Sequence, residues 1–133
     1  MEVIRTSNPD AAFALLPFYV PDNQTREQIA EELFARLCNA PDDTLLVVGR
    51  ENNKIKFMSI SYVHDDEVFC WQAYHDKTVS RKWVDLVFGM IQGWAKVKNK
   101  KRITAIPNRN PKLWKRRWGF DIAEDNSVYK EIQ

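Results

Sequence analysis

The sequence predicts an α+β fold: a mixed, mostly antiparallel sheet with helices on both faces. Two observations lead to this prediction. Apolar residues recur with period two in three successive segments at the middle of the chain, and at spacings of three and four before and after them. These segments do not follow a strict strand–helix–strand repetition. Their order is strand, helix, helix, three strands, helix, strand, helix, strand.

The length and composition indicate one globular domain over residues 1–133. A chain of 133 residues is of ordinary domain size, and 44% hydrophobic with 29% charged residues is typical of a packed protein. No repeat and no Gly/Ser-rich linker divides it. No apolar run approaches the ~18 residues of a membrane span, and the first residues lack a signal-peptide pattern. We therefore expect a cytoplasmic protein without a membrane partner.

The N-terminal half contains the first strand, two helices and an antiparallel meander. Thr25 precedes the second helix, and turns at 51–54 and 64–67 separate the meander strands. The expected elements are a strand at Glu2–Arg5, helices at 11–16 and about 25–38, and strands at 44–50, 55–63 and 68–75. In the middle meander strand, one face is expected to carry Ile55, Phe57, Ser59, Ser61 and Val63, and the other Met58, Ile60 and Tyr62.

A long helix over 79–98 follows Thr78 or Ser80. Its apolar stripe is expected to be buried against the sheet, and comprises Trp83, Leu86, Val87, Met90, Ile91, Trp94 and Val97. Gly89 and Gly93 lie inside the helix, where we expect them to permit close approach to the sheet. The C-terminal part reads as a strand at 102–106, a short helix at 112–118 ending at Gly119, and strand pieces at 120–123 and 128–132.

Charge is distributed unevenly along the chain. Residues 1–70 hold 6 basic and 12 acidic residues, whereas residues 71–133 hold 14 basic and 6 acidic ones. The stretch from Leu86 to Phe120 contains no acid. Its basic residues are Lys96, Lys98, Lys100, Lys101, Arg102, Arg109, Lys112, Lys115, Arg116 and Arg117. The basic 96–117 region therefore predicts an anionic cofactor or an acidic partner, with a solvated face as the plainer interpretation.

The reactive side chains suggest neither a disulfide framework nor a metal site. Cys38 and Cys70 are expected to be reduced, buried thiols, and with only two histidines no spacing resembles a zinc site. Nucleic-acid binding is a weaker possibility, because Trp114 and Trp118 lie near the basic residues but are spaced to pack inward.

The C-terminal half resembles the GNAT superfamily of N-acetyltransferases. Gly93-Trp94-Ala95-Lys96 closes the long helix, Lys101-Arg102-Ile103 opens the next strand, and Asn108 precedes Gly119-Phe120 by eleven residues. The order of elements is also similar to that family's fold. In its short length and few glycines, the sequence is similar to GNAT members from tailed bacteriophages.

The resemblance implies acetyl-CoA as cofactor. The family's glycine-rich pyrophosphate loop would fall on residues 79–84, but Lys82 and Val84 stand where the glycines would be. Ser80, Arg81 and Lys82 are then expected to meet the pyrophosphate, and Tyr74 and His75 to pair with the pantetheine arm. Asn108 is carried over as a further cofactor-binding residue.

The resemblance also implies two catalytic roles. Lys115 occupies the position at which the family often has a tyrosine that protonates the leaving thiolate, and we assign it the role of general acid. Glu67 is the candidate base for the attacking amine, with Asp66 and His75 as alternatives. The sequence thus predicts an acetyl-CoA-dependent N-acyltransferase. The alternative is a catalytically inactive binding or structural protein of this fold, such as a virion component or an inhibitor of a host factor.

Overall fold

The computed structural model describes residues 1–13, 25–107 and 110–132. Seven strands form a single sheet in the order β1-β2-β3-β4-β5-β7-β6, and all neighbours are antiparallel except β4 and β5. The strands are β1 (Glu2–Arg5), β2 (Thr44–Glu51), β3 (Lys54–His64), β4 (Glu67–His75), β5 (Arg102–Ala105), β6 (Asp121–Ile122) and β7 (Val128–Glu131). The predicted α+β class and the mixed, mostly antiparallel sheet are confirmed.

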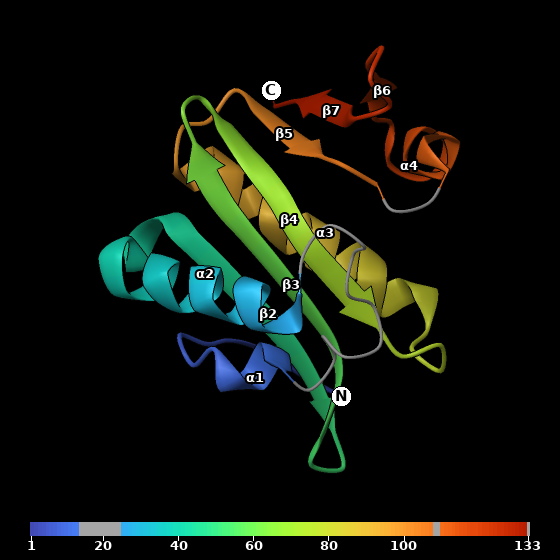
Figure 1. Cartoon of the computed structure of the whole chain (residues 1–133). Coiled ribbons are helices and arrows are strands. Elements are labelled where there is room, and N and C mark those ends of the chain that lie inside the picture. Colours follow the sequence, from blue (N-terminus) through green and yellow to red (C-terminus); the bar gives the residue numbers. More distant parts are fainter. Residues whose placement is uncertain (14–24, 108–109, 133) are drawn as a thin grey trace.

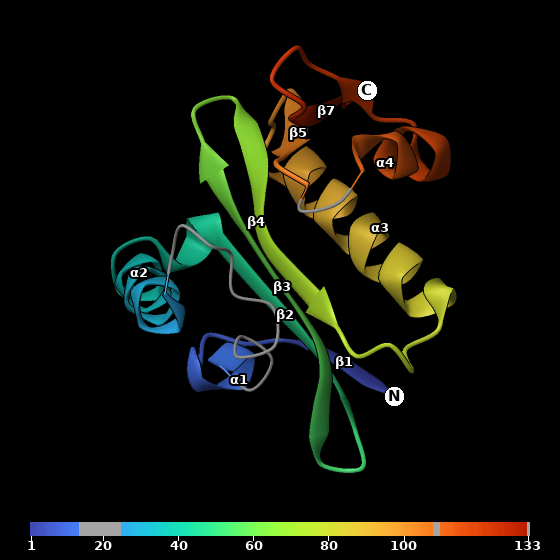
Figure 2. The same cartoon turned by 45° about the vertical axis from the view of Figure 1, so that its right-hand side comes forward.

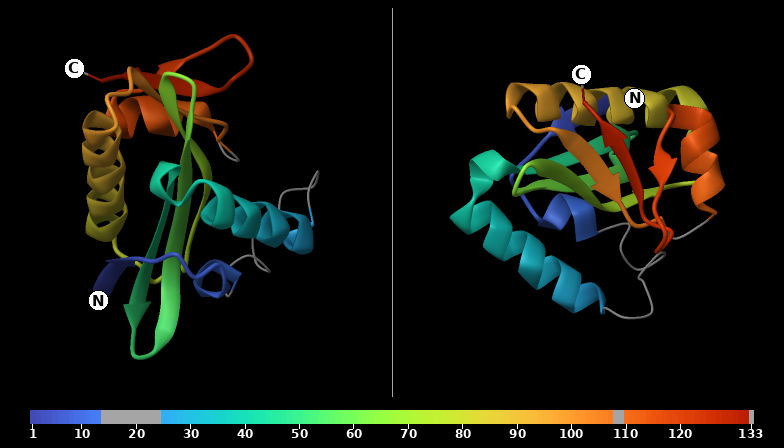
Figure 3. Two further views of the ribbon diagram at one scale, coloured as in Figure 1. Left: turned by 90° about the vertical axis from the view of Figure 1, so that its left-hand side faces the viewer. Right: turned by 90° about the horizontal axis from the view of Figure 1, so that it is seen from above.

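Helices cover both faces of the sheet, as predicted. They are α1 (Asp10–Phe13), α2 (Arg26–Asn39), α3 (Arg81–Val97) and α4 (Pro111–Trp118), with a 3-10 turn at Pro41–Asp43. Figures 1 and 2 show α1 and α2 on one face of the sheet and α3 and α4 on the other. Figure 3 shows the same arrangement from two further directions. None of the described helices is long and apolar enough to cross a membrane.

Local signals explain where the helices begin and end. The Thr25 hydroxyl accepts a hydrogen bond from the Gln28 backbone N–H, and the Gln28 side chain accepts one from the Thr25 N–H, which forms a capping box for α2. Near the other end of the chain, α4 begins at Pro111 and ends at Trp118. The next residue, Gly119, caps the helix with a φ of 76°, which glycine adopts without strain. Of the helix predicted at 11–16, residues 14–16 lie outside the described part of the chain.

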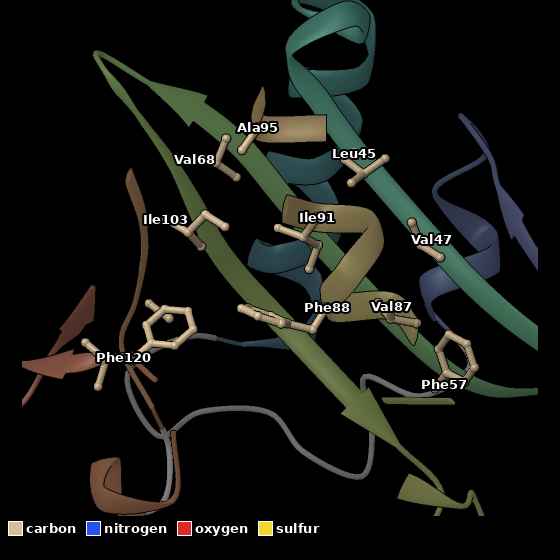
Figure 4. Close-up of a cluster of buried hydrophobic side chains, with 12 residues drawn as sticks. Leu45, Val47, Phe57, Val68, Val87, Phe88, Ile91, Ala95, Ile103 and Phe120 are labelled. Carbon is tan, nitrogen blue, oxygen red and sulfur yellow. The ribbon is translucent and has the colours of Figure 1, made fainter. Parts of the chain in front are cut away.

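Two hydrophobic cores lie on opposite faces of the sheet. The larger one, shown in Figure 4, packs the sheet against α3 and α4 and includes Leu45, Val47, Phe57, Val68, Val87, Phe88, Ile91, Ala95, Ile103 and Phe120. The smaller one lies under α1 and α2 and includes Ile29, Leu33, Leu46, Val48, Met58, Ile60 and Tyr74. The β2–β3–β4 meander contributes side chains to both cores, which explains its alternating pattern.

The buried face of α3 differs from the predicted stripe. Leu86 is 46% exposed and Val97 79% exposed, whereas Phe88, which the stripe omitted, is buried. The helix is thus rotated toward the side that carries Phe88 and Ala95. Gly89 and Gly93 lie on the opposite, exposed face, and a Cβ at either position would meet nothing within 4 Å. The prediction that these glycines permit close approach to the sheet is wrong.

A bulge in β3 corrects one further prediction. Gly49 pairs with Phe57 and Arg50 with Ile55, so Lys56 is the extra residue. Because a bulge reverses the alternation of side chains, Ile55 packs against the smaller core rather than beside Phe57. The prediction that both cysteines are buried is wrong for Cys38, which is exposed. Cys70 is half-buried as a residue with its thiol in the interior, and both cysteines are free.

Candidate functional site

The sheet opens between β4 and β5. These parallel strands pair only from Glu67 with Arg102 to Cys70 with Ala105, although β4 continues to His75. Figure 1 shows the chain that follows β5 running away from β4 beyond this point. No described strand pairs with the Trp71–His75 edge of β4 on that side. Backbone N–H and C=O groups along such an edge can bind an extended ligand as an added strand would.

A second bulge lies where the strands part. Ile60 of β3 pairs with Gln72 and Ser61 with Cys70, which leaves Trp71 as the extra residue of β4. A bulge twists and bends the strand that contains it. The bend at Trp71 therefore coincides with the end of the β4–β5 pairing and carries β4 away from β5.

Cys70 and Ser61 face each other across the strands at this point. Burial raises the pKa of the Cys70 thiol to about 11, and the neighbouring Ser61 hydroxyl acts in the opposite direction. The thiol is therefore protonated at neutral pH. Because the thiolate is the reactive form, this environment disfavours Cys70 as a nucleophile.

Tyr74 and His75, which are predicted to pair with the pantetheine arm, are the last two residues of β4. The Tyr74 ring is buried in the smaller core and its hydroxyl donates to the Gln72 side chain. Its side chain thus anchors the strand, which leaves backbone groups as the means of contact with a ligand. His75 is exposed, and its Nδ1 lies 3.1 Å from the Asp76 carbonyl oxygen.

The connection from β4 to α3 is a short polar turn rather than a glycine-rich loop. The Asp76 carboxylate accepts hydrogen bonds from the Thr78 N–H and the Thr78 hydroxyl, both at 2.8 Å. These two bonds lower the pKa of Asp76, with smaller contributions from nearby lysines. The Val79 N–H donates to the Asp76 carbonyl at 3.0 Å. The turn fixes the direction in which the chain enters α3.

The first turn of α3 is exposed and cationic. Ser80 occupies the N-cap position, but its side chain accepts no hydrogen bond from the helix, and the first turn contains no acid. Arg81 and Lys82 are exposed, and Val84 is half-buried. The positive end of the helix dipole and two cationic side chains together favour an anion at this end of the open β4 edge.

The C-terminal end of α4 is fastened to the first turns of α3. The Asp85 carboxylate accepts a hydrogen bond at 3.0 Å from Trp118 Nε1 and another at 3.2 Å from Arg117 Nε. Arg117 Nη2 also donates to the Arg81 carbonyl oxygen at 3.3 Å. The Trp118 bond, followed by the charge of Arg117, lowers the pKa of Asp85.

This arrangement predicts a pH-dependent contribution to stability. Because folding lowers the pKa of Asp85, its contribution is complete above the pKa of the unfolded chain and is lost as pH falls through the folded-state value. We expect Asp85→Asn to lower Tm at pH 7, and the difference from wild type to shrink as pH falls from about 6 to about 2.5. Thermal unfolding followed by circular dichroism measures this. Asp121→Asn, on the exposed edge strand β6, is the control. A Tm difference for Asp85→Asn that is constant with pH would contradict this account.

The basic 96–117 region is less unopposed than its sequence suggests. Four of its cations form ion pairs with acids from other elements: Lys98 with Asp43, Lys101 with Asp66, Arg102 with Glu131 and Arg117 with Asp85. Five others have no carboxylate within 4 Å among the described residues, namely Lys96, Lys100, Lys112, Lys115 and Arg116, although Lys100 donates to the Asp65 carbonyl oxygen. Trp114 and Trp118 pack against Phe88 and Phe120, with ring centroids 5.1–5.2 Å apart. They are therefore not free stacking surfaces for bases.

Glu67 and Lys115, the two predicted catalytic residues, make no hydrogen bond or ion pair with each other or with Trp71–His75 in the described structure. Glu67 begins β4, roughly 13 Å along the strand from Trp71, and its carboxylate accepts a hydrogen bond from the Thr104 hydroxyl at 2.7 Å. Lys115 is exposed on α4. Their roles stay predictions. Asn108 lies outside the described residues.

One cluster beside this site was missed from the sequence. Tyr62 of β3 contacts Phe69 and Trp71 of β4, with ring centroids 5.5 and 6.0 Å apart, and the Arg36 guanidinium lies 3.4 Å from the Tyr62 ring centroid. The spacing of four between Glu32 and Arg36 is visible in the sequence as a helical ion pair. The aromatic partners depend on strand register, which the sequence alone does not specify.

The chain has the fold of GNAT acetyltransferases. Ard1 from Thermoplasma volcanium aligns with a TM-score of 0.73 at 10% identity over 99% of this chain and 97% of that one. The PaiA N-acetyltransferase of Thermoplasma acidophilum, solved in complex with coenzyme A, gives 0.67 at 9% identity over 100% and 99%. A GNAT-family acetyltransferase from Streptococcus pneumoniae gives 0.66 at 15% identity over 99% and 100%.

Sequence comparison adds no closer relationship. No protein-family profile matches the chain. No curated protein matches it either. The likeness therefore concerns the fold, and residue roles depend on the chemistry of the site itself.

Proposed function

We propose that this protein is an acyl-CoA-dependent N-acyltransferase that uses acetyl-CoA to acylate an amine. The observation that supports this most strongly is the opening between β4 and β5, whose pairing ends at Cys70 and Ala105 whereas β4 continues to His75, close in sequence to the cationic first turn of α3. When bound, acetyl-CoA would supply an acyl group activated as a thioester.

The residues of the site fit such a cofactor in two respects. Pantetheine contains amide groups that can pair with the backbone of β4 where this strand extends beyond its last pair with β5. Its pyrophosphate can lie at the first turn of α3, where Ser80, Arg81 and Lys82 are exposed. Charge would then contribute more to phosphate binding than the close backbone approach that glycines allow. The turn that Asp76 stabilises joins the end of β4 to the first turn of α3, so it sets the position of one part of the site relative to the other.

A second function is favoured by Lys82 and Val84. Both side chains lie in the first turn of α3 at the positions where the family has glycines, and Val84 is stiff and branched. A chain that had lost cofactor binding could carry these residues without penalty. The alternative proposal is therefore a binding or structural protein of the same fold.

Calorimetry with acetyl-CoA distinguishes the two functions. We expect wild type to bind the cofactor at micromolar concentration, and Arg81→Ala with Lys82→Ala to weaken binding by about tenfold or more and to reduce its salt dependence, because two cations near the phosphates are lost. Lys54→Ala, at the exposed start of β3, should bind as wild type does. No binding at millimolar cofactor would contradict the transferase proposal and support the binding protein.

A further inference from the structure

The aromatic cluster beside the open edge has the composition of a receptor for an organic cation. Tyr62 is its central ring, and Phe69 and Trp71 meet it edge-to-face at interplanar angles of 65° and 70°. All three rings are half-buried on the sheet face that also carries α2. Ring faces attract cations, and an amine or guanidinium group over such rings is stabilised by their electron density. We call Tyr62, Phe69 and Trp71 the aromatic cage.

A cation of the chain itself already lies near two of the three rings of the cage. The Arg36 guanidinium lies 3.4 Å from the centroid of Tyr62 and 5.9 Å from that of Trp71. Its Nη2 donates to Glu32 at 3.1 Å, one turn earlier in α2. The rings together with the Glu32 carboxylate therefore accommodate a flat cationic group.

Arg36 does not satisfy all its hydrogen bonds in this position. Its Nε atom is buried, with no hydrogen-bond partner among the described residues, and a buried donor without a partner destabilises the arrangement. About 30% of the Arg36 side chain is nevertheless exposed, so the cage can be reached from solvent. An incompletely bonded, solvent-accessible group can be displaced by a ligand of the same chemistry.

The cage is adjacent to the proposed reaction site. Trp71 forms one wall of the cage and is also the first β4 residue beyond the last β4–β5 pair. A ligand with its cationic group in the cage would extend toward the open edge. Glu32 and Glu67 lie on the same side of the sheet as the cage, and their negative charges favour a cation over a neutral or acidic ligand.

We propose that the aromatic cage is the acceptor-recognition site, that Arg36 fills it in the absence of substrate, and that the acceptor is a dication. One cationic group of this acceptor would replace Arg36 over Tyr62, while a second, amine-bearing end would lie at the opening between β4 and β5. Diamines and guanidino-amines belong to this chemical class. The inference rests on the proposed transferase function for the role of the amine, but binding to the cage can be measured without cofactor.

Agmatine and butylurea are suitable probes, because both have a planar group on a four-carbon chain and only agmatine carries charge. Calorimetry without acetyl-CoA is run on wild type, Arg36→Ala and Arg36→Gln, which keeps a donor for Glu32 should the alanine variant fold poorly. We expect both variants to bind agmatine at least about tenfold more tightly than wild type does. Adding Tyr62→Ala to either variant should abolish this gain, and Arg50→Ala, at the distant β1–β2 edge, should leave wild-type affinity unchanged.

The outcomes separate this proposal from the proposed function. If folded Arg36 variants bind agmatine no better than wild type, or bind butylurea equally well, the cage is not a cation receptor and Arg36 is only a structural tie between α2 and the sheet. That result would stand even if acetyl-CoA bound normally. Conversely, agmatine binding that depends on Tyr62 in a protein without affinity for acetyl-CoA would support the cage and contradict the transferase.

Discussion

Phe120→Ala is expected to destabilise the protein by about 3–5 kcal/mol, because it removes a fully buried ring from the larger core. Phe120 lies 5.4 Å from Phe88 of α3 and 5.2 Å from Trp114 of α4, measured between ring centroids. It therefore joins two helices to the sheet, and its loss leaves a cavity between elements that cannot collapse independently. Domains of this size are stable by only about 5–15 kcal/mol, so the change removes a large share of the total.

Urea unfolding followed by circular dichroism measures this effect, and Phe34→Ala is the matched control. Phe34 is 58% exposed on α2, so the same chemical change should alter the free energy of unfolding by less than about 0.5 kcal/mol. Equal effects at positions 34 and 120 would show that Phe120 is not the packing centre that the contacts indicate.

Gly49→Ala is expected to destabilise the protein by about 1–3 kcal/mol through overpacking. A Cβ at position 49 would lie 2.1 Å from Cε1 of Phe57, its cross-strand neighbour. Phe57 is buried in the larger core, so its ring cannot move aside without disturbing other side chains. Gly49 is therefore required for the space it leaves.

Gly93→Ala provides a control of opposite sign. Position 93 faces open space on α3, and alanine there should stabilise the helix by about 0.5–1 kcal/mol. Shortening the neighbour with Phe57→Leu should recover part of the loss caused by Gly49→Ala but should not add to the gain from Gly93→Ala. If Gly49→Ala stabilises as Gly93→Ala does, the close packing of Gly49 on Phe57 is wrong.

Local sequence patterns predicted the elements well because each depends on neighbouring residues. The capping residues of α2, the glycine after α4 and the asparagines of the β2–β3 turn act within a few positions along the chain. Asn52 and Asn53 adopt positive φ, as a two-residue hairpin turn requires. The alternating pattern of the meander likewise predicted the ends of its three strands to within a residue or two.

The candidate site was harder to predict because it depends on strand register and on partners distant in sequence. The bulges at Lys56 and Trp71 have no local signal, yet the second marks where β4 leaves β5. The rotation of α3 that buries Phe88 depends on Trp118 and Phe120, which follow it by thirty residues or more. Ion pairs such as Lys98–Asp43 likewise join segments that a linear charge count treats separately.

The start of α3 at Ser80 and the exposure of Arg81 and Lys82 could be predicted, since a cap and charged side chains are local features. The aromatic cage could not, because Arg36, Tyr62 and Trp71 come from three different elements. Glu67 illustrates the same limit. It lies near an end of β4 as expected, but register places it at the closed end of the β4–β5 pair.

Residue-resolved amide exchange, with and without acetyl-CoA, tests the central claim most directly. If the opening between β4 and β5 holds the cofactor, millimolar acetyl-CoA should slow exchange at amides within Trp71–His75 and alter exchange at Arg81 and Lys82, because the bound cofactor would cover this segment and the first turn of α3. Amides of the β2–β3 turn at 51–54 should not change. Unaltered exchange along Trp71–His75, or protection confined to another part of the chain, would contradict the proposed cofactor site.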